Sequence, residues 1–323
     1  MRLVLAYDGS ACADAARYLV ARLPLPPGSA ITLITVLERG AEAPGAPEFA
    51  LGASPSHEAE AQLLSDLQGM LHEAAAPLRS TDRHVDTRVV RGRPASAIVD
   101  EAAAIQPDLL VMGSRGHGPL ASVLMGSVSA EVVDHAPCPV LVARHPSVHR
   151  LVIGADGSAS ADRALALLRR WPIFAGHPAT VVTVGEPISA WAERVSAAVY
   201  PMWAETHESS VDRRAQVRLI AERAAEQLAR AGIGAELEVR EGDAADQLIR
   251  VAATTDADLI VVGSRGLSTL PRLVLGSVAR KVLLHAPQSV LVVREARERV
   301  PEPEREAVRE ERRVPAGAAM AFA

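Results

Sequence analysis

Residues 109–116 read LLVMGSRG, and nine residues later the chain continues with Gly126-Ser127. The arrangement recurs 150 positions further on, where residues 259–266 read LIVVGSRG and Gly276-Ser277 follows after another nine residues. The four apolar residues that open each copy indicate a buried strand. Glycines after such a strand let backbone amides approach a ligand, and a Gly-Ser that opens a helix presents unpaired amides at the positive end of the helix dipole. This combination favours an anion, so the sequence predicts two nucleotide-type sites on a duplicated scaffold.

The duplication extends beyond the glycines. His135-Ala136-Pro137 recurs as residues 285–287 at the same offset of 150, and Asp8-Gly9-Ser10 recurs as residues 156–158 at an offset of 148. A repeat of this length is a duplicated domain rather than a solenoid unit, because each copy can build its own core. We therefore predict one domain over residues 1–146 and a second over 147–295. Residues 296–323 are rich in charge and lack apolar periodicity, which predicts a disordered tail.

The composition argues against several classes of function. The net charge of −5 disfavours a general affinity for nucleic acid or for anionic membranes. No apolar run approaches the roughly 20 residues of a membrane helix, so we expect a cytoplasmic protein. The two cysteines make neither a disulfide framework nor a metal cluster. Lys281 is the only lysine, and no glycine precedes it, so the chain lacks the Gly-Lys-Ser/Thr of a phosphate-binding P-loop. Any Schiff-base chemistry would have to use the Lys281 side chain.

Short apolar strands alternate with helical patterns in each half, which indicates a parallel sheet covered by helices on both faces. We predict first-half strands at residues 2–7, 30–36, 85–90, 109–112 and 140–143, and helices near 11–22, 58–76, 95–105 and 128–135. Second-half strands are predicted at 151–155, 180–184, 235–239, 259–262 and 290–293. Ser10 and Ser158 are predicted N-caps of the first helix in each half.

In each half, a strand is followed by Gly-x-x-Gly, nine further residues and Gly-Ser. This arrangement resembles the nucleotide-binding motif of the universal stress protein family. The early Asp-Gly-Ser and the final His-Ala-Pro with its Val-Leu-Val strand are similar to that family too, over roughly residues 1–144 and 150–294. The resemblance implies a tandem member with two doubly wound, Rossmann-like α/β domains, each a five-stranded parallel sheet in the order 3-2-1-4-5. In such a sheet strands one and four meet at a topological switch point, where ligands bind beyond the carboxyl ends of the strands.

The resemblance also implies a ligand and the residues that bind it. ATP would contact Asp8 or Asp156 at its adenine end, with Val36 or Val184 as an apolar wall and Met112 or Val262 facing the ribose and base. The ribose and phosphates would be held by Gly113, Gly116, Gly126, Ser127 and Val128 in one half, and by Gly263, Gly266, Gly276, Ser277 and Val278 in the other. Mg²⁺ could accompany the ATP, held mainly by phosphate oxygens and water. No catalytic residue and no protein-held metal is expected.

Each feature has a simpler reading. The Gly-Ser-Arg-Gly loops could be turns after buried strands, and Asp-Gly-Ser is turn chemistry by itself. Arg115 and Arg265 could pair with phosphates or lie solvated on the surface. Tyr7 precedes Asp8 where a smaller residue is usual; pointing into the crevice, it would stack on adenine or block the base. These alternatives stay open from the sequence.

We therefore predict an ATP-binding regulatory or stress-response protein that acts on an unknown protein partner. No pair of residues shared by both halves makes a convincing base and nucleophile, although slow ATP hydrolysis stays open. The alternative is an interaction module that has lost nucleotide binding. The last strands, residues 140–143 and 290–293, are expected to pair within the chain as an intramolecular pseudo-dimer. Whether two chains then form a homodimer stays open.

Overall fold

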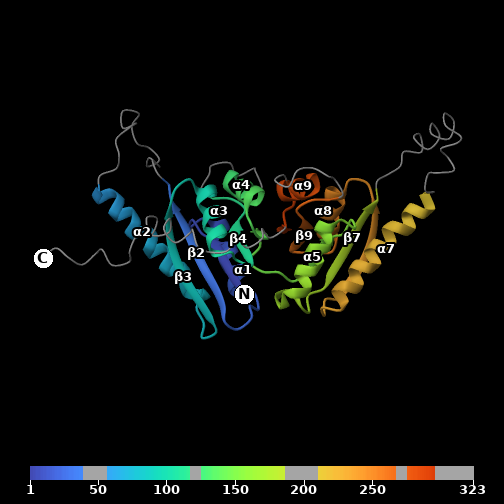
Figure 1. Ribbon diagram of the computed structural model, residues 1–323, viewed down its shortest axis with the longest axis horizontal. Helices are drawn as coiled ribbons and strands as arrows, with labels where there is room; N and C mark the ends of the chain where they lie inside the picture. Colours follow the sequence, from blue (N-terminus) through green and yellow to red (C-terminus); the bar gives the residue numbers. More distant parts are fainter. Residues whose placement is uncertain (39–56, 117–124, 186–209, 267–274, 295–323) are drawn as a thin grey trace, which may run out of the picture.

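The computed structural model describes residues 1–38, 57–116, 125–185, 210–266 and 275–294. The predicted tail, residues 296–323, lies outside this part of the chain. Figure 1 shows the two halves side by side, with helices α2 (His57–Ala75) and α7 (Ser210–Ala229) at the two outer ends.

Within the described residues, each half repeats one order of strands and helices, close to the predicted bounds. The first half contains β1 (Arg2–Ala6), α1 (Ala11–Arg22), β2 (Ser29–Leu37), α2, η2 (Ala76–Leu78), β3 (Arg83–Arg91), α3 (Pro94–Ile105), β4 (Leu109–Gly113), α4 (Ser127–His135) and β5 (Val140–Ala143). The second contains β6 (Leu151–Gly154), α5 (Ala159–Arg170), η3 (Pro172–Phe174), β7 (Ala179–Gly185), α7, β8 (Ala235–Glu241), α8 (Ala244–Thr254), β9 (Leu259–Gly263), α9 (Ser277–His285) and β10 (Ser289–Val293).

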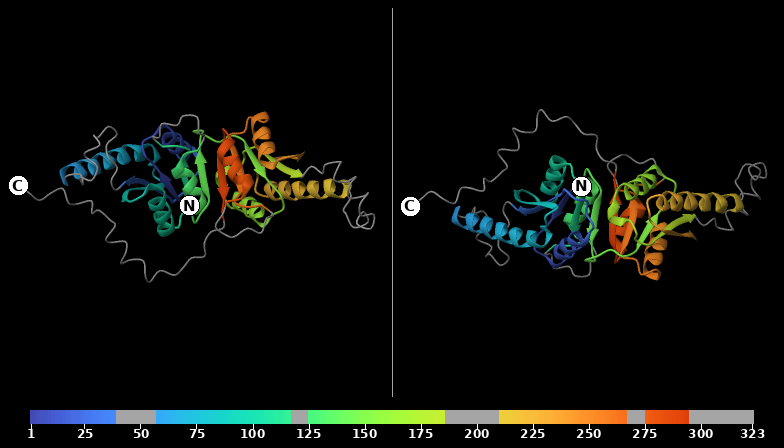
Figure 2. Two further views of the ribbon diagram at one scale, coloured as in Figure 1. Left: turned by 90° about the horizontal axis from the view of Figure 1, so that it is seen from above. Right: turned by 90° about the horizontal axis from the view of Figure 1, so that it is seen from below.

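The strands form one continuous sheet of ten rather than two separate sheets of five. Its order is β3-β2-β1-β4-β5-β10-β9-β6-β7-β8, so each half keeps the implied order 3-2-1-4-5. Pairing is parallel within each half, and β5 pairs with β10 antiparallel, with Val142 opposite Val290 and Val140 opposite Val292. Figure 2 shows these two strands next to each other at the centre of the molecule. The predicted pairing of the last strands is thus present, and it covers one edge of each half's sheet.

Two helical layers cover the sheet. Alternate residues point to opposite faces: Leu3, Leu5 and the following Tyr7 belong to the core layer that includes residues of α1, α2, α5 and α7. Val4 and Ala6 belong to the layer that includes residues of α3, α4, α8 and α9. Nearly all side chains of the central strands are buried, as their continuous apolar runs predict for a sheet covered on both sides. In the central strands of the described residues, a ligand would therefore bind beyond the strand ends rather than on a face of the sheet.

Candidate functional site

In the first half β1 lies between β2 and β4, at the topological switch point of the sheet. Ala6 is in register with Ile34 on one side and Met112 on the other. Because side chains alternate along a strand, Val36, two positions after Ile34, belongs to the same face as Ala6 and Met112. Met112 is buried and Val36 is half-buried, whereas Asp8, just beyond the end of β1, is exposed.

The second half builds the same arrangement with β6 between β7 and β9. Gly154 is in register with Val182, so Asp156 and Val184 occupy the positions of Asp8 and Val36. Val262 takes the place of Met112 and is likewise buried, with 4% of its surface exposed.

Both aspartates hold the turn that starts the first helix. Asp8 Oδ1 accepts a hydrogen bond from the Ser10 amide at 3.0 Å, and Asp156 Oδ1 accepts one from the Ser158 amide at 2.9 Å. The residue between them is glycine in each half because the backbone there is left-handed, with φ of +80° at Gly9. The turn interpretation of Asp-Gly-Ser is therefore correct, and the turn holds the carboxylate just beyond the end of β1 or β6.

Ser10 and Ser158 cap the first helices as predicted, each accepting a hydrogen bond from the amide three residues on at 3.2 Å. Ser10 Oγ also donates to the Arg115 carbonyl at 3.2 Å, which links the start of α1 to the glycine loop. The second half makes a related link differently, since the Arg265 amide donates to Ser160 Oγ at 3.2 Å. These links were missed, because neither serine stands out from the turn and helix pattern around it.

The glycine loop closes on the start of the helix that follows it. The Gly126 amide donates to the Ser114 carbonyl, and the Gly276 amide donates to the Ser264 carbonyl, both at 2.8 Å. Ser129 Oγ adds hydrogen bonds to the Gly113 and Ser114 carbonyls at 3.0 and 3.2 Å. Ser129 could not be found from the repeat, because the second half has alanine at the equivalent position.

The N-termini of α4 and α9 carry no side-chain cap within the described residues. Their N-cap residues are Gly126 and Gly276, in contrast to the serines that cap α1 and α5. The first intrahelical hydrogen bonds run from the Ala130 amide to Gly126 and from the Arg280 amide to Gly276. The amides of the first helical residues, among them those of the exposed Ser127 and Ser277 and the half-buried Val128 and Val278, have no partner inside their helix. Such an end is suited to an anion.

The motif glycines divide into two kinds. A Cβ on Gly113 would lie 2.6 Å from the Cys12 carbonyl carbon, and one on Gly263 would lie 2.7 Å from that of Ser160. These two glycines therefore let the first helix pack on the end of β4 or β9. A Cβ on Gly116 would instead lie 2.5 Å from Asp8 Oδ2, and one on Gly266 would lie 2.9 Å from Asp156 Oδ2. The structure thus brings each aspartate against the second glycine of its motif.

Tyr7 points away from the face of the sheet that carries Val36 and Met112. Its ring belongs to the core on the α1 and α2 face, and its hydroxyl donates to Asp14 Oδ1 at 2.9 Å. Burial, followed by the hydrogen bond to Asp14, raises the Tyr7 pKa to about 12. Val36 and Met112 lie on the opposite face of the sheet, so Tyr7 neither stacks on a ligand there nor blocks it.

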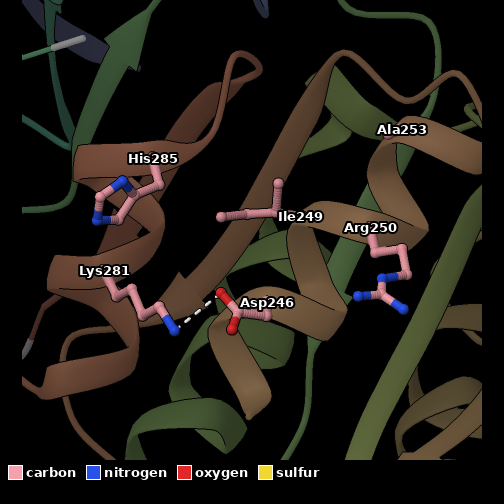
Figure 3. A pocket seen from close by; sticks show the side chains of 6 residues that line it. All are labelled: Asp246, Ile249, Arg250, Ala253, Lys281 and His285. Atoms are coloured by element: carbon pink, nitrogen blue, oxygen red, sulfur yellow. Dashed lines mark ion pairs between the residues drawn. The ribbon is translucent and has the colours of Figure 1, made fainter. Parts of the chain in front are cut away.

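A separate shallow pocket lies between α8 and α9 and is lined by Asp246, Ile249, Arg250, Ala253, Lys281 and His285 (Figure 3). Lys281 Nζ lies 2.8 Å from Asp246 Oδ1 and 3.1 Å from Asp243 Oδ1. The hydrogen bonds to Asp246 and Asp243 raise the Lys281 pKa, so this amine stays protonated. A protonated amine is not a nucleophile, which argues against Schiff-base chemistry at the one lysine.

No group of three or more His, Cys, Asp or Glu side chains within the described residues could hold a metal ion. No helix within them is both long and apolar enough to cross a membrane.

Comparison with known proteins agrees with the duplicated architecture. The profile of the universal stress protein family matches the chain twice, over residues 1–144 and 147–294. A Thermus aquaticus universal stress protein is 35% identical over 142 residues, which are 44% of this chain and 97% of the relative. A Mycobacterium tuberculosis H37Rv universal stress protein is 28% identical over 254 residues, which are 72% of this chain and 76% of the relative.

Among solved structures, a universal stress protein from Archaeoglobus fulgidus superimposes with a TM-score of 0.64. The match covers 91% of this chain and 98% of that protein, and at 19% identity it shows the shared fold alone. Two consecutive family matches, each covering a complete half, establish that this chain belongs to the universal stress protein family.

Proposed function

We propose that each half of this protein binds an adenine nucleotide, ATP in the first place, and that the bound nucleotide regulates a stress-response activity rather than undergoing dedicated catalysis. The observation that carries this proposal is the pair of helix N-termini, of α4 and α9, which have no side-chain cap among the residues that the structure describes and which close against a glycine loop at the switch point of each sheet. A phosphate group would complete the hydrogen bonding of these amides and would interact favourably with the helix dipole.

The other contacts of the proposed site follow from its chemistry. Val36 and Met112, or Val184 and Val262, would be the apolar side chains on the side of the purine face. Asp8 or Asp156 would accept hydrogen bonds from the amino group of the base or from ribose hydroxyls, because an ionised carboxylate accepts hydrogen bonds from neutral donors. The same negative charge would repel the phosphates. Gly113, Gly116, Gly126, Ser127 and Val128 would surround the ribose and phosphates in the first site. Gly263, Gly266, Gly276, Ser277 and Val278 would do so in the second.

A Mg²⁺ ion that accompanies ATP would be bound mainly by phosphate oxygens and water, since the described residues offer no ready set of ligands. Regulation requires that a protein partner distinguish the nucleotide-bound from the nucleotide-free protein. Pulldowns with and without ATP test this part of the proposal. Identical partner sets in both would contradict it.

Calorimetric titration of nucleotide-free protein with ATP–Mg²⁺ tests the sites themselves. Ser127→Asp and Ser277→Asp are suitable variants, because a carboxylate in the first helical turn favours the helix by about 0.3–1 kcal/mol but repels a phosphate. At ~4 Å and an effective dielectric constant of ~20 the repulsion reaches ~4 kcal/mol per charge pair, so we expect at least a tenfold loss at the altered site. Ser127→Ala and Ser277→Ala keep the amides and serve as matched controls with at most a severalfold loss.

We expect about two ATP per wild-type chain and about one in each aspartate variant. One ATP in the wild type would identify a single working half. Absence of binding in folded protein would exclude the nucleotide role and leave the interaction module.

A further inference from the structure

In each half, the helix that would bind phosphate ends at a proline that cannot donate to a carbonyl in its last turn. In α9 the Ala286 amide donates to the Val282 carbonyl at 2.8 Å and ends the regular hydrogen bonding. The next carbonyl, that of Leu283, would require the amide of residue 287. That residue is proline, which has no N–H.

An arginine from the other half supplies the missing donor. Arg144, which directly follows β5, donates from Nη2 to the Leu283 carbonyl at 2.6 Å and from Nη1 to the Gln288 carbonyl at 3.0 Å. Its backbone amide donates to Ser289 Oγ at 3.0 Å. A cation at a helix C-terminus also interacts favourably with the helix dipole.

The same arrangement occurs in the opposite direction. In α4 the Ala136 amide donates to the Val132 carbonyl, and Pro137 cannot donate to the Val133 carbonyl. Arg294, which directly follows β10, donates from Nη1 to that carbonyl. The repeated His-Ala-Pro thus creates a requirement that is met from the other half of the chain.

The antiparallel pairing of β5 with β10 explains why the contacts cross. Val142 lies opposite Val290, so Arg144, two residues later, lies level with Gln288, two residues earlier. Burial lowers the Arg144 pKa to about 10, which still leaves the guanidinium protonated at neutral pH. A second contact between the halves runs directly from helix to helix, because Arg280 of α9 pairs with Asp134 of α4 at 2.9 Å.

We infer that Arg144 and Arg294 are crossed positioning residues: Arg144 of the first half orients the phosphate-binding helix of the second half, and Arg294 of the second half orients that of the first. Each arginine holds one end of a nine-residue helix whose other end forms the proposed anion site. Such a helix is about 13 Å long and moves as one rod, so a tilt at its C-terminus displaces the amides at its N-terminus. This inference rests on the proposed nucleotide function.

The test uses Arg144→Met and Arg294→Met in the full chain, since methionine keeps an apolar stem but cannot donate. Each change is combined with Ser127→Asp or Ser277→Asp, so that ATP–Mg²⁺ titration reports one site at a time. We expect Arg144→Met to weaken the second site about three- to tenfold and to leave the first within twofold. Arg294→Met should do the reverse, and lysine in place of each arginine should restore part of the lost affinity.

Hydrogen exchange gives a readout that needs no nucleotide. Arg144→Met should speed exchange in α9 about fivefold more than in α4, and Arg294→Met should give the opposite pattern. Arg250→Met, an exposed α8 arginine in the second half, is the matched control and should change neither helix. Equal weakening of both sites, or weakening only in the arginine's own half, would overturn the inference. If the wild type binds no ATP the proposed function fails, and the exchange pattern alone then supports or overturns the crossed positioning.

Discussion

Gly113→Ala separates the packing role of one motif glycine from the binding role of another. A Cβ at this position would lie 2.6 Å from the Cys12 carbonyl carbon, 2.7 Å from its oxygen and 2.8 Å from the Ala13 nitrogen. All three are backbone atoms of α1, so no side chain can rotate away to relieve the contact. Ordinary contact begins at 3.4 Å, so α1 and β4 must separate by roughly 0.8 Å.

Overpacking of this kind costs about 1–3 kcal/mol, and a backbone clash belongs at the upper end of that range. For a unit of about 150 residues, ~2–3 kcal/mol lowers the melting temperature by roughly 4–12 °C. Gly116→Ala should differ, because its Cβ meets only the Asp8 carboxylate, which can move. We expect this change to cost little stability but to displace Asp8 and weaken ATP binding in the first half.

Thermal unfolding and ATP titration of the two variants test this reasoning. Gly69→Ala is the control for the alanine itself, since a Cβ there meets nothing within 4 Å inside α2 and should stabilise the protein by ~0.5–1 kcal/mol. A Gly113→Ala protein as stable as the wild type would refute the packing argument. A Gly116→Ala protein with unchanged affinity would refute the role given to Asp8 and its neighbouring glycine.

Two further predictions concern single interactions. Tyr7→Phe should cost about 0.5–1.5 kcal/mol at pH 7 by removing the hydrogen bond to Asp14. Because the folded-state Tyr7 pKa is about 12 and its unfolded value is about 10, the wild type should lose stability as the pH rises from 10 through 12. That loss should be absent in Tyr7→Phe and kept in Tyr18→Phe, as measured by denaturant unfolding at each pH; an identical profile in all three would contradict the assignment. Arg280→Gln should cost less than about 1 kcal/mol, and the cost should shrink in 1 M salt, because the pair with Asp134 is partly exposed. A larger, salt-independent cost in unfolding experiments would show that this pair contributes more than a surface ion pair.

Much of the fold could be predicted because local signals agree with the family resemblance. Apolar runs locate the strands, Ser10 and Ser158 cap the helices, and the repeated spacing reveals the duplication. The single sheet of ten depends on the register between β5 and β10. Those strands are 150 residues apart, and no local pattern encodes their alignment.

The site was predictable in outline but not in its contacts. The sequence alone does not show which face of the sheet Tyr7 occupies. The alternation of side chains along β1 predicts that face only when the bounds and orientation of the strand are known. The sequence also does not show that Gly113 contacts the backbone of α1 whereas Gly116 contacts the Asp8 carboxylate, because both glycines follow the same strand. The crossed arginines were missed because their partners are carbonyls, which carry no side-chain signature.

We propose above all that both halves hold an adenine nucleotide at the switch point of the sheet. A crystal structure of the full chain grown with ATP and Mg²⁺ tests it most directly. The claim predicts two nucleotides per chain, with the bases against Val36 and Met112 and against Val184 and Val262, and the phosphates on the amides that open α4 and α9. Crystals grown at saturating ATP with both crevices empty, or with nucleotide bound only elsewhere, would contradict it.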